Sequence, residues 1–233
     1  MPQSSLWSHS FSSISFLGEL PLYLKTGIFG LLVFALSYSY MRWLNIPGEL
    51  NKSMADTAII LMGFSMLLSS VCYFWNFLDW VIIYRKYLGL IGFAFALVHV
   101  GLSWTPFMSL LNADTWQQGK MWPVLMGAMA LGIFSMMALV SNSFIARKLG
   151  FVTWKRILRT GYGAIMLVWL HVVLLKSARW ITWYQGGMKT PPSLSLLVTI
   201  FMTVVVIMRI CLWWSLRKAA SRPIKRNALH SRS

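Results

Sequence analysis

The chain has 233 residues, of which 58% are hydrophobic and 11% are charged, and its formal net charge is +16. Such a charge would suggest nucleic-acid binding in a soluble protein. Here the charges form short clusters between apolar runs of about 20 residues, the length of a membrane-spanning helix. These features exclude an ordinary soluble domain and predict a multi-pass membrane protein that contacts lipid and no nucleic acid. Cys72 and Cys211 both fall in apolar runs, so we expect no disulfide.

Six apolar spans follow one another along the chain. We place them at residues 22–44, 55–77, 87–104, 122–140, 154–175 and 191–216. Open sheets leave unpaired backbone groups in lipid, so each span should be a helix. The predicted fold class is therefore all-α, a polytopic membrane bundle of six transmembrane helices.

The basic residues between the spans indicate an orientation. If both termini are cytoplasmic, 14 lysines and arginines lie on the inner side and six on the outer side, with Arg209 inside the last span and not counted. Cytoplasmic loops carry such an excess of basic residues. We therefore predict that the termini are cytoplasmic and that the membrane is the cell inner membrane.

Two of the four histidines, His99 and His171, lie inside apolar spans. Lys86 precedes His99 by 13 residues and Arg159 precedes His171 by 12, which correspond to ~20 Å and ~18 Å of helix. Because these two spans run in the same direction, both histidines should lie at one depth, in the outer half of the membrane. A histidine in hydrocarbon is costly and is a functional-site candidate by default. The pair fits one haem iron with two axial imidazoles best.

A lone membrane histidine can also hydrogen-bond a neighbouring helix, and this alternative applies to each residue taken singly. A proton relay would need buried acids. We expect none, since Asp56 and Asp79 lie at or beyond the ends of their spans. Gly92 and Ala164 each precede a histidine by seven residues, about two turns, on the same helix face. Small residues there could make room for a cofactor or allow close helix packing, and both interpretations stay open.

Short segments around these histidines resemble the ferric-reductase-like transmembrane superfamily. Residues 85–90 (Arg-Lys-Tyr-Leu-Gly-Leu) and 96–99 are similar to the third helix of the six-transmembrane metalloreductases, the family named for a prostate epithelial antigen. Residues 146–150 (Ala-Arg-Lys-Leu-Gly) and 154–156, with His171, resemble the bacterial haem subunit that serves periplasmic methionine sulfoxide reductase. The resemblance covers roughly residues 80 to 200.

The resemblance implies one b-type haem, with His99 and His171 as the axial ligands of its iron. It also implies electrons that move outward, with a flavin (FAD or FMN) near the cytoplasmic face. Candidates for a flavin phosphate, by charge-assisted hydrogen bonds, are Arg85, Lys86, Arg147, Lys148, Arg156 and Arg159. The excess of cytoplasmic cations explains the same residues equally well.

Two departures from the family pattern bear on the cofactors. Two-haem members carry another histidine about four turns before each ligand, where this chain has Lys86 and Leu158, so we expect no second haem of that kind. No glycine-rich nucleotide fingerprint precedes a helix. The electrons must therefore come from another protein, a quinol or a diffusible flavin.

We divide the chain into an N-terminal polar or interfacial segment (1–20), a six-helix haem-binding transmembrane domain (21–216) and a basic cytoplasmic tail (217–233). The first functional hypothesis is electron transfer from a cytoplasmic flavin or quinol donor to an outer acceptor, a metal ion or a periplasmic reductase. The protein would then be a ferric-reductase-like oxidoreductase or its electron-transfer subunit. The alternative is an accessory structural subunit of a larger respiratory or photosynthetic membrane complex.

Overall fold

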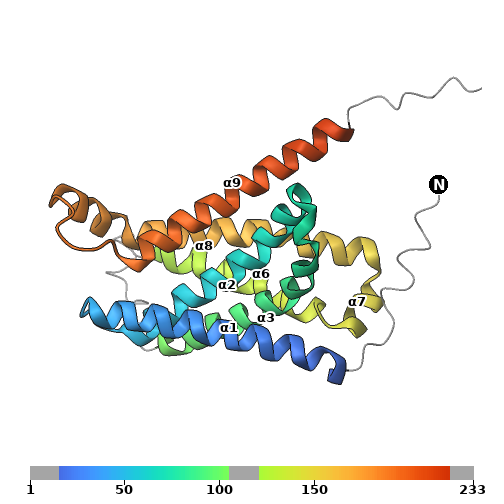
Figure 1. The fold of residues 1–233 in the computed structure, drawn as a ribbon, viewed down its shortest axis with the longest axis horizontal. Coiled ribbons are helices and arrows are strands. Elements are labelled where there is room, and N and C mark those ends of the chain that lie inside the picture. Colours follow the sequence, from blue (N-terminus) through green and yellow to red (C-terminus); the bar gives the residue numbers. More distant parts are fainter. Residues whose placement is uncertain (1–15, 105–120, 221–233) are drawn as a thin grey trace, which may run out of the picture.

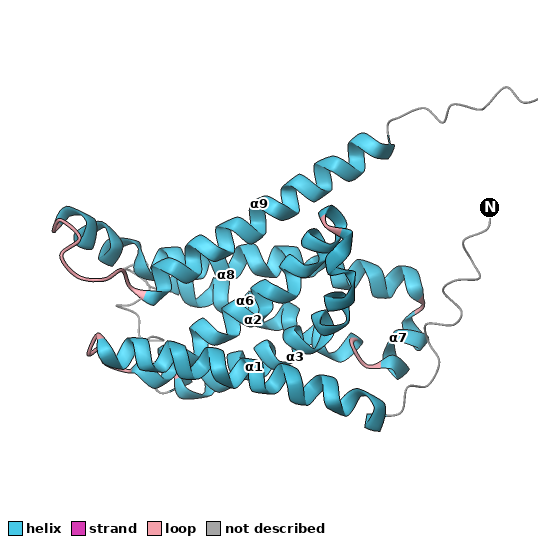
Figure 2. Ribbon diagram, in the orientation of Figure 1, coloured by secondary structure: helices cyan, strands magenta, loops and turns pink. Residues whose placement is uncertain are grey.

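The computed structural model describes residues 16–104 and 121–220, and this part of the chain is helical, without a strand (Figure 2). Six of its helices are long and apolar enough to cross a membrane, which confirms the predicted all-α bundle. In chain order the elements are α1 (Phe16–Trp43), α2 (Glu49–Phe74), the 3-10 helix η2 (Asn76–Tyr84), α3 (Arg85–Leu102), α6 (Met121–Val140), α7 (Ser143–Leu149), α8 (Phe151–Gln185) and α9 (Leu194–Ala220) (Figure 1).

The predicted spans differ from the observed helices mainly at their ends. α8 has 35 residues, or ~52 Å at the standard rise, whereas the hydrocarbon layer is ~30 Å thick. Apolar content marks only the part of a helix that lies in lipid, so the polar turns beyond Leu175 were not predicted. The short helix α7 was also missed, although Asn142 caps it by accepting a hydrogen bond from the Phe144 N–H (2.8 Å). Most of the predicted terminal segments, at residues 1–15 and 221–233, lie outside the described residues.

α2 holds the bundle together, because it packs against α1, α3 and α9, while α6 packs against α8 and α8 against α9. The shared apolar core lies between α2, α6, α8 and α9 and includes Met62, Phe134, Ile165 and Met202. α9 runs obliquely to the other helices, and its last turns lie away from the bundle (Figure 1). The core therefore lies where these four helices meet.

The two small residues singled out in the sequence lie in tight helix contacts. A Cβ at Gly92 would lie 2.9 Å from Met62 Cγ and 3.1 Å from Leu61 Cβ, so the glycine lets α3 approach α2. Ala164 has no exposed surface and belongs to the apolar core. This geometry supports close packing as the role of both residues, and their contact with a cofactor stays a prediction.

Gly63 on α2 tests the packing of α2 against α9. A Cβ at this position would lie 2.5 Å from Phe201 Cε1 and 3.2 Å from Met202 Sδ. We expect Gly63→Ala to lower the free energy of unfolding by about 1–3 kcal/mol, the usual cost of an overpacked core. Gly132→Ala on α6 is the control, because nothing lies within 4 Å of its added Cβ. Thermal unfolding in detergent measures both, and equal stabilities of the two variants would contradict the packing described here.

Candidate functional site

His99 lies one turn before the end of α3, and a residue of α2 fixes its ring. The ring Nδ1 is 2.6 Å from the side-chain oxygen of Asn51 and 3.2 Å from its backbone oxygen. An amide oxygen can only accept, so Nδ1 carries the proton and donates it. The amide of Asn51 is itself held, since its Nδ2 donates to Ser103 Oγ at 2.9 Å. The lone pair of His99 is therefore on Nε2.

His171 lies in the middle of α8 and is fixed by the first turn of α6. Its Nδ1 donates to the backbone oxygen of Pro123 at 2.6 Å. One turn further along α6, a Cβ at Gly127 would lie 2.9 Å from the His171 Nδ1 and 3.1 Å from its Cε1. A glycine at 127 thus makes room for the imidazole beside the helix backbone. The lone pair of this ring is also on Nε2.

The two rings share the arrangement that is typical of metal-binding histidines. Each is half-buried, and each Nδ1–H is bound to an oxygen acceptor. Such a partner sets the tautomer and leaves Nε2 to bind a metal. His171 is among the charged neighbours of His99, so the two rings lie in the same part of the bundle.

Two imidazoles with free lone pairs are a donor set that haem iron accepts. Across residues 16–104 and 121–220, no group of three or more His, Cys, Asp or Glu side chains could hold a metal ion. The residues present therefore fit an iron that takes its remaining ligands from a macrocycle. Asn51, Pro123 and Gly127 were missed by the sequence analysis, because each lies on a different helix from the histidine it contacts.

Asp56 is buried, with 5% of its surface exposed, and this corrects the sequence analysis. The expectation that the bundle contains no buried acid was wrong. The physical reason is that α2 begins at Glu49, so Asp56 lies two turns inside the helix and not at its edge. Lys52 and Lys176 are its charged neighbours.

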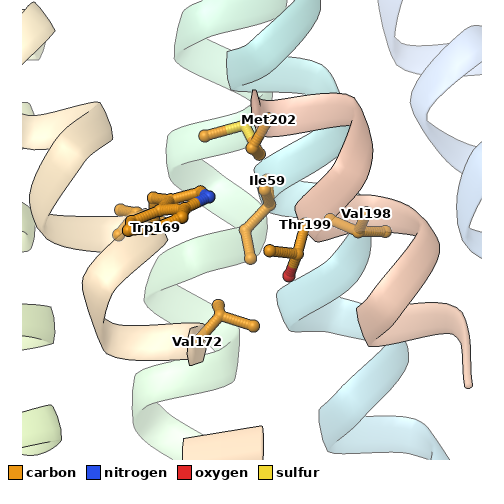
Figure 3. Close-up of a pocket in the computed structure, with 7 residues that line it drawn as sticks. Ile59, Trp169, Val172, Val198, Thr199 and Met202 are labelled. Atoms are coloured by element: carbon orange, nitrogen blue, oxygen red, sulfur yellow. The ribbon is translucent and has the colours of Figure 1, made fainter. Parts of the chain in front are cut away.

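An apolar seam lies further inside the bundle, between α2, α8 and α9 (Figure 3). It has no room for a water molecule. Its lining residues are Ile59, Val168, Trp169, Val172, Val198, Thr199 and Met202. The indole N–H of Trp169 donates to Thr203 Oγ1 of α9 (3.0 Å), so the polar group of this tryptophan has a hydrogen-bond partner beside the seam.

Several basic residues lie at the end of the bundle that is opposite to the histidines, and their surroundings differ. The guanidinium of Arg209 lies 3.8 Å from the centroid of the Tyr162 ring, and its charged neighbours are Arg85 and Arg159. The structure thus brings two predicted phosphate ligands, Arg85 and Arg159, together with Arg209. Arg209 was not counted among the basic residues of either side, because it lies within an apolar span. A cation inside a span is itself a signal of function that could have identified it.

Lys86 points elsewhere, although it follows Arg85 in the chain. Its Nζ forms an ion pair with the Glu19 carboxylate, at 2.9 and 3.0 Å from the two oxygens. The pair lies in an open cleft of about 450 Å³ that is lined by Glu19, Tyr23, Lys86, Leu90, Ala138, Ser141, Asn142 and Ser143. A cleft of this size is within the range of small-molecule sites. The other predicted phosphate ligands are exposed, namely Arg147, Lys148 and Arg156.

The fold and the two histidines define a multi-pass helical membrane protein with a pair of half-buried imidazoles that are each held by a hydrogen bond. A comparison with protein families found that residues 54–167 match the model described as ferric reductase like transmembrane component. This match agrees with the resemblance to the ferric-reductase-like transmembrane superfamily that the sequence predicted. The match includes His99 and ends four residues before His171. A comparison with curated proteins gave no match.

Gly127→Ala tests whether the space beside Gly127 is needed to hold the His171 ring. The added Cβ would push against the ring, so we expect the imidazole to leave the Pro123 carbonyl. A haem held by this ring, as we propose for the site, would then bind about tenfold or more weakly, the effect of one lost hydrogen bond and some strain. Absorbance of bound haem in the purified protein measures this. Gly163→Ala, on α8 with open space around its Cβ, should bind haem as the wild type does. Equal haem contents in both variants would argue against this role of Gly127.

Proposed function

We propose that the protein transfers electrons outward across the cell inner membrane through one b-type haem, with His99 and His171 as its axial ligands. One observation carries the proposal: both Nδ1 atoms donate to oxygen acceptors, at 2.6 Å each, so both Nε2 lone pairs are available for one iron. The ferric-reductase-like transmembrane component that residues 54–167 match supports a role in transmembrane electron transfer. The outward direction rests on the distribution of basic residues.

A bound haem would supply a one-electron iron couple. The protein's own residues bind and orient it. Asn51 and the Pro123 carbonyl hold the rings in one tautomer and one orientation, and such outer-shell partners also raise the basicity of the ligand nitrogen. The apolar core beside the histidines excludes water, which lowers the local polarity around the iron site and adjusts its reduction potential.

The electron donor would enter at the opposite end of the bundle. Arg85, Arg159 and Arg209 gather there, and the ion pairs of the described residues, Arg42–Glu49 and Lys86–Glu19, include none of them. Uncompensated guanidinium groups favour phosphate, which supports a flavin donor, FMN or FAD. A quinol is the second candidate donor, because the cleft at Glu19 and Lys86 offers a carboxylate and a cation side by side. A metal ion or a periplasmic reductase would accept the electron on the outer side.

A reduced-minus-oxidised absorbance spectrum of the purified protein tests the haem. We expect the bands of a six-coordinate b-type haem, and their loss in His99→Ala and in His171→Ala, because each removes one of two axial ligands. His230→Ala, in the basic tail, should leave the spectrum unchanged. A wild-type protein without haem, or spectra that survive both replacements, would reject the proposal and favour an accessory subunit of a larger complex.

Binding of FMN and FAD, followed by flavin fluorescence, tests the donor. Arg209→Gln should weaken binding about tenfold, since one charge-assisted hydrogen bond is lost. Arg156→Gln is the matched control, because Arg156 is exposed and apart from the three clustered arginines. If the wild type binds neither flavin, the flavin donor is rejected and the quinol remains. If both variants lose affinity equally, general attraction to the basic face explains the binding.

A further inference from the structure

The cleft at Glu19 and Lys86 lies where three helices end on one side of the bundle. Glu19 is in the first turn of α1, Lys86 is the second residue of α3, and Ser141 and Asn142 connect α6 to α7. Figure 1 shows the start of α1 and the helix α7 at the same end of the bundle. The ends of membrane spans lie at the level of the lipid head groups. A head group of the leaflet that we predict to be cytoplasmic therefore reaches this cleft.

The cleft is polar at the head-group level and apolar below it. α1 and α6 form two of its walls, and each packs against α3, whereas α1 and α6 make no extensive contact with one another. Leu90 lies one turn deeper than Lys86, and Ala138 lies one turn deeper than Asn142. The volume of about 450 Å³ thus joins charged and hydroxyl groups to an apolar floor. Such a site suits a ligand with a polar head and an apolar tail.

The charges within the cleft cancel. Among the described residues that line it, the charged ones are Glu19 and Lys86, and the Lys86 Nζ lies 2.9 and 3.0 Å from the two carboxylate oxygens. A lysine has three N–H groups, so at least one is left for another acceptor, and each carboxylate oxygen can accept a further hydrogen bond. A ligand with one negative and one positive charge would complete both groups, and the four charges would then alternate in sign.

The turn between α6 and α7 adds one donor and one acceptor to the same cleft. The Oδ1 of Asn142 accepts from the Phe144 N–H at 2.8 Å, which leaves its Nδ2 as a donor. The hydroxyl of Ser141 donates to a backbone oxygen of α6 at 2.8 Å, which leaves its oxygen as an acceptor. A phosphate would accept hydrogen bonds from Lys86 and Asn142. An ammonium group would donate to Glu19 and Ser141.

We propose that the cleft binds the head group of phosphatidylethanolamine, with its phosphate on Lys86 and its ammonium on Glu19. A primary ammonium has N–H groups that donate to a carboxylate in strong, charge-assisted hydrogen bonds, whereas the quaternary ammonium of phosphatidylcholine has none. Phosphatidylglycerol brings a phosphate without a cation, so its charge would lie unbalanced beside the Glu19 carboxylate. The inference concerns a lipid site and does not depend on the haem.

Native mass spectrometry of the full-length protein in detergent tests the inference with three lipids that share the same acyl chains. We expect the wild type to bind phosphatidylethanolamine about tenfold more tightly than phosphatidylcholine or phosphatidylglycerol, the effect of one charge-assisted hydrogen bond. Glu19→Gln should remove this preference, because phosphatidylethanolamine alone loses a partner. Glu49→Gln is the matched control, since it removes the carboxylate of the Arg42–Glu49 ion pair outside the cleft, and it should keep the preference.

A variant that leaves the ion pair intact tests the apolar part of the cleft. Ala138→Leu should fill the floor and weaken phosphatidylethanolamine binding, while thermal unfolding without added lipid checks that each variant is folded. Glycerophosphoethanolamine has the same head group without acyl chains, and equal affinity for it would indicate a soluble ligand and reject the lipid.

Three other results would also overturn the proposal. A wild type that binds phosphatidylglycerol most tightly would show general attraction to the basic face of the bundle. A preference for phosphatidylethanolamine that survives Glu19→Gln would place the lipid elsewhere. Binding of a short-chain quinone that is lost in Glu19→Gln, without any preference among the lipids, would make the cleft the site of the quinol donor.

Discussion

The candidate site depends on one interaction made twice, an imidazole Nδ1–H that donates to an oxygen on a neighbouring helix. The acceptor for His99 comes from α2, and the acceptor for His171 comes from α6. Each ring direction is therefore set by a helix pair, α2 with α3 and α6 with α8. These two pairs make extensive contacts in the bundle, so the packing that stabilises the fold also holds the two Nε2 atoms in place.

The charged residues form two clusters, one on each side of the apolar core. Lysines and a buried aspartate lie at the end near the histidines, on α2 and α8. Three arginines lie toward the other end, on α3, α8 and α9. α8 takes part in both clusters and carries His171 between them. Because partly buried charge is costly without a partner, a ligand of opposite charge at either cluster would stabilise the protein.

Much of the fold could be predicted from the sequence, because lipid imposes a simple rule on apolar runs. The rule failed where helices continue past the hydrocarbon layer, as α8 does beyond Leu175. It also placed the start of α2 too late, so Asp56 was taken for an edge residue. His99 and His171 were identifiable because polar residues inside spans are rare.

The partners of the histidines could not be predicted in this way. Asn51 and Pro123 each lie 48 residues from the ring that they contact, and nothing in the local pattern connects them. The role of Gly127 is apparent only in the structure, where the ring of His171 lies against it. Arg209 was hidden by the apolar residues around it. In each case the prediction would have required knowing which helices are neighbours, and the pattern of a single sequence does not indicate this.

The two histidine anchors differ in how evolution can alter them. The acceptor of His171 is a main-chain carbonyl, which persists whatever side chain replaces Pro123. The acceptor of His99 is a side-chain amide, which one substitution at Asn51 would remove, or convert to a charged carboxylate. The amide also depends on Ser103, since a rotated amide would present a donor in place of the acceptor. Side-chain substitutions can therefore remove the partner of the ring on the α3 side of the site, at Asn51 or Ser103, whereas on the α8 side they can change the space beside the ring, at Gly127, but not its acceptor.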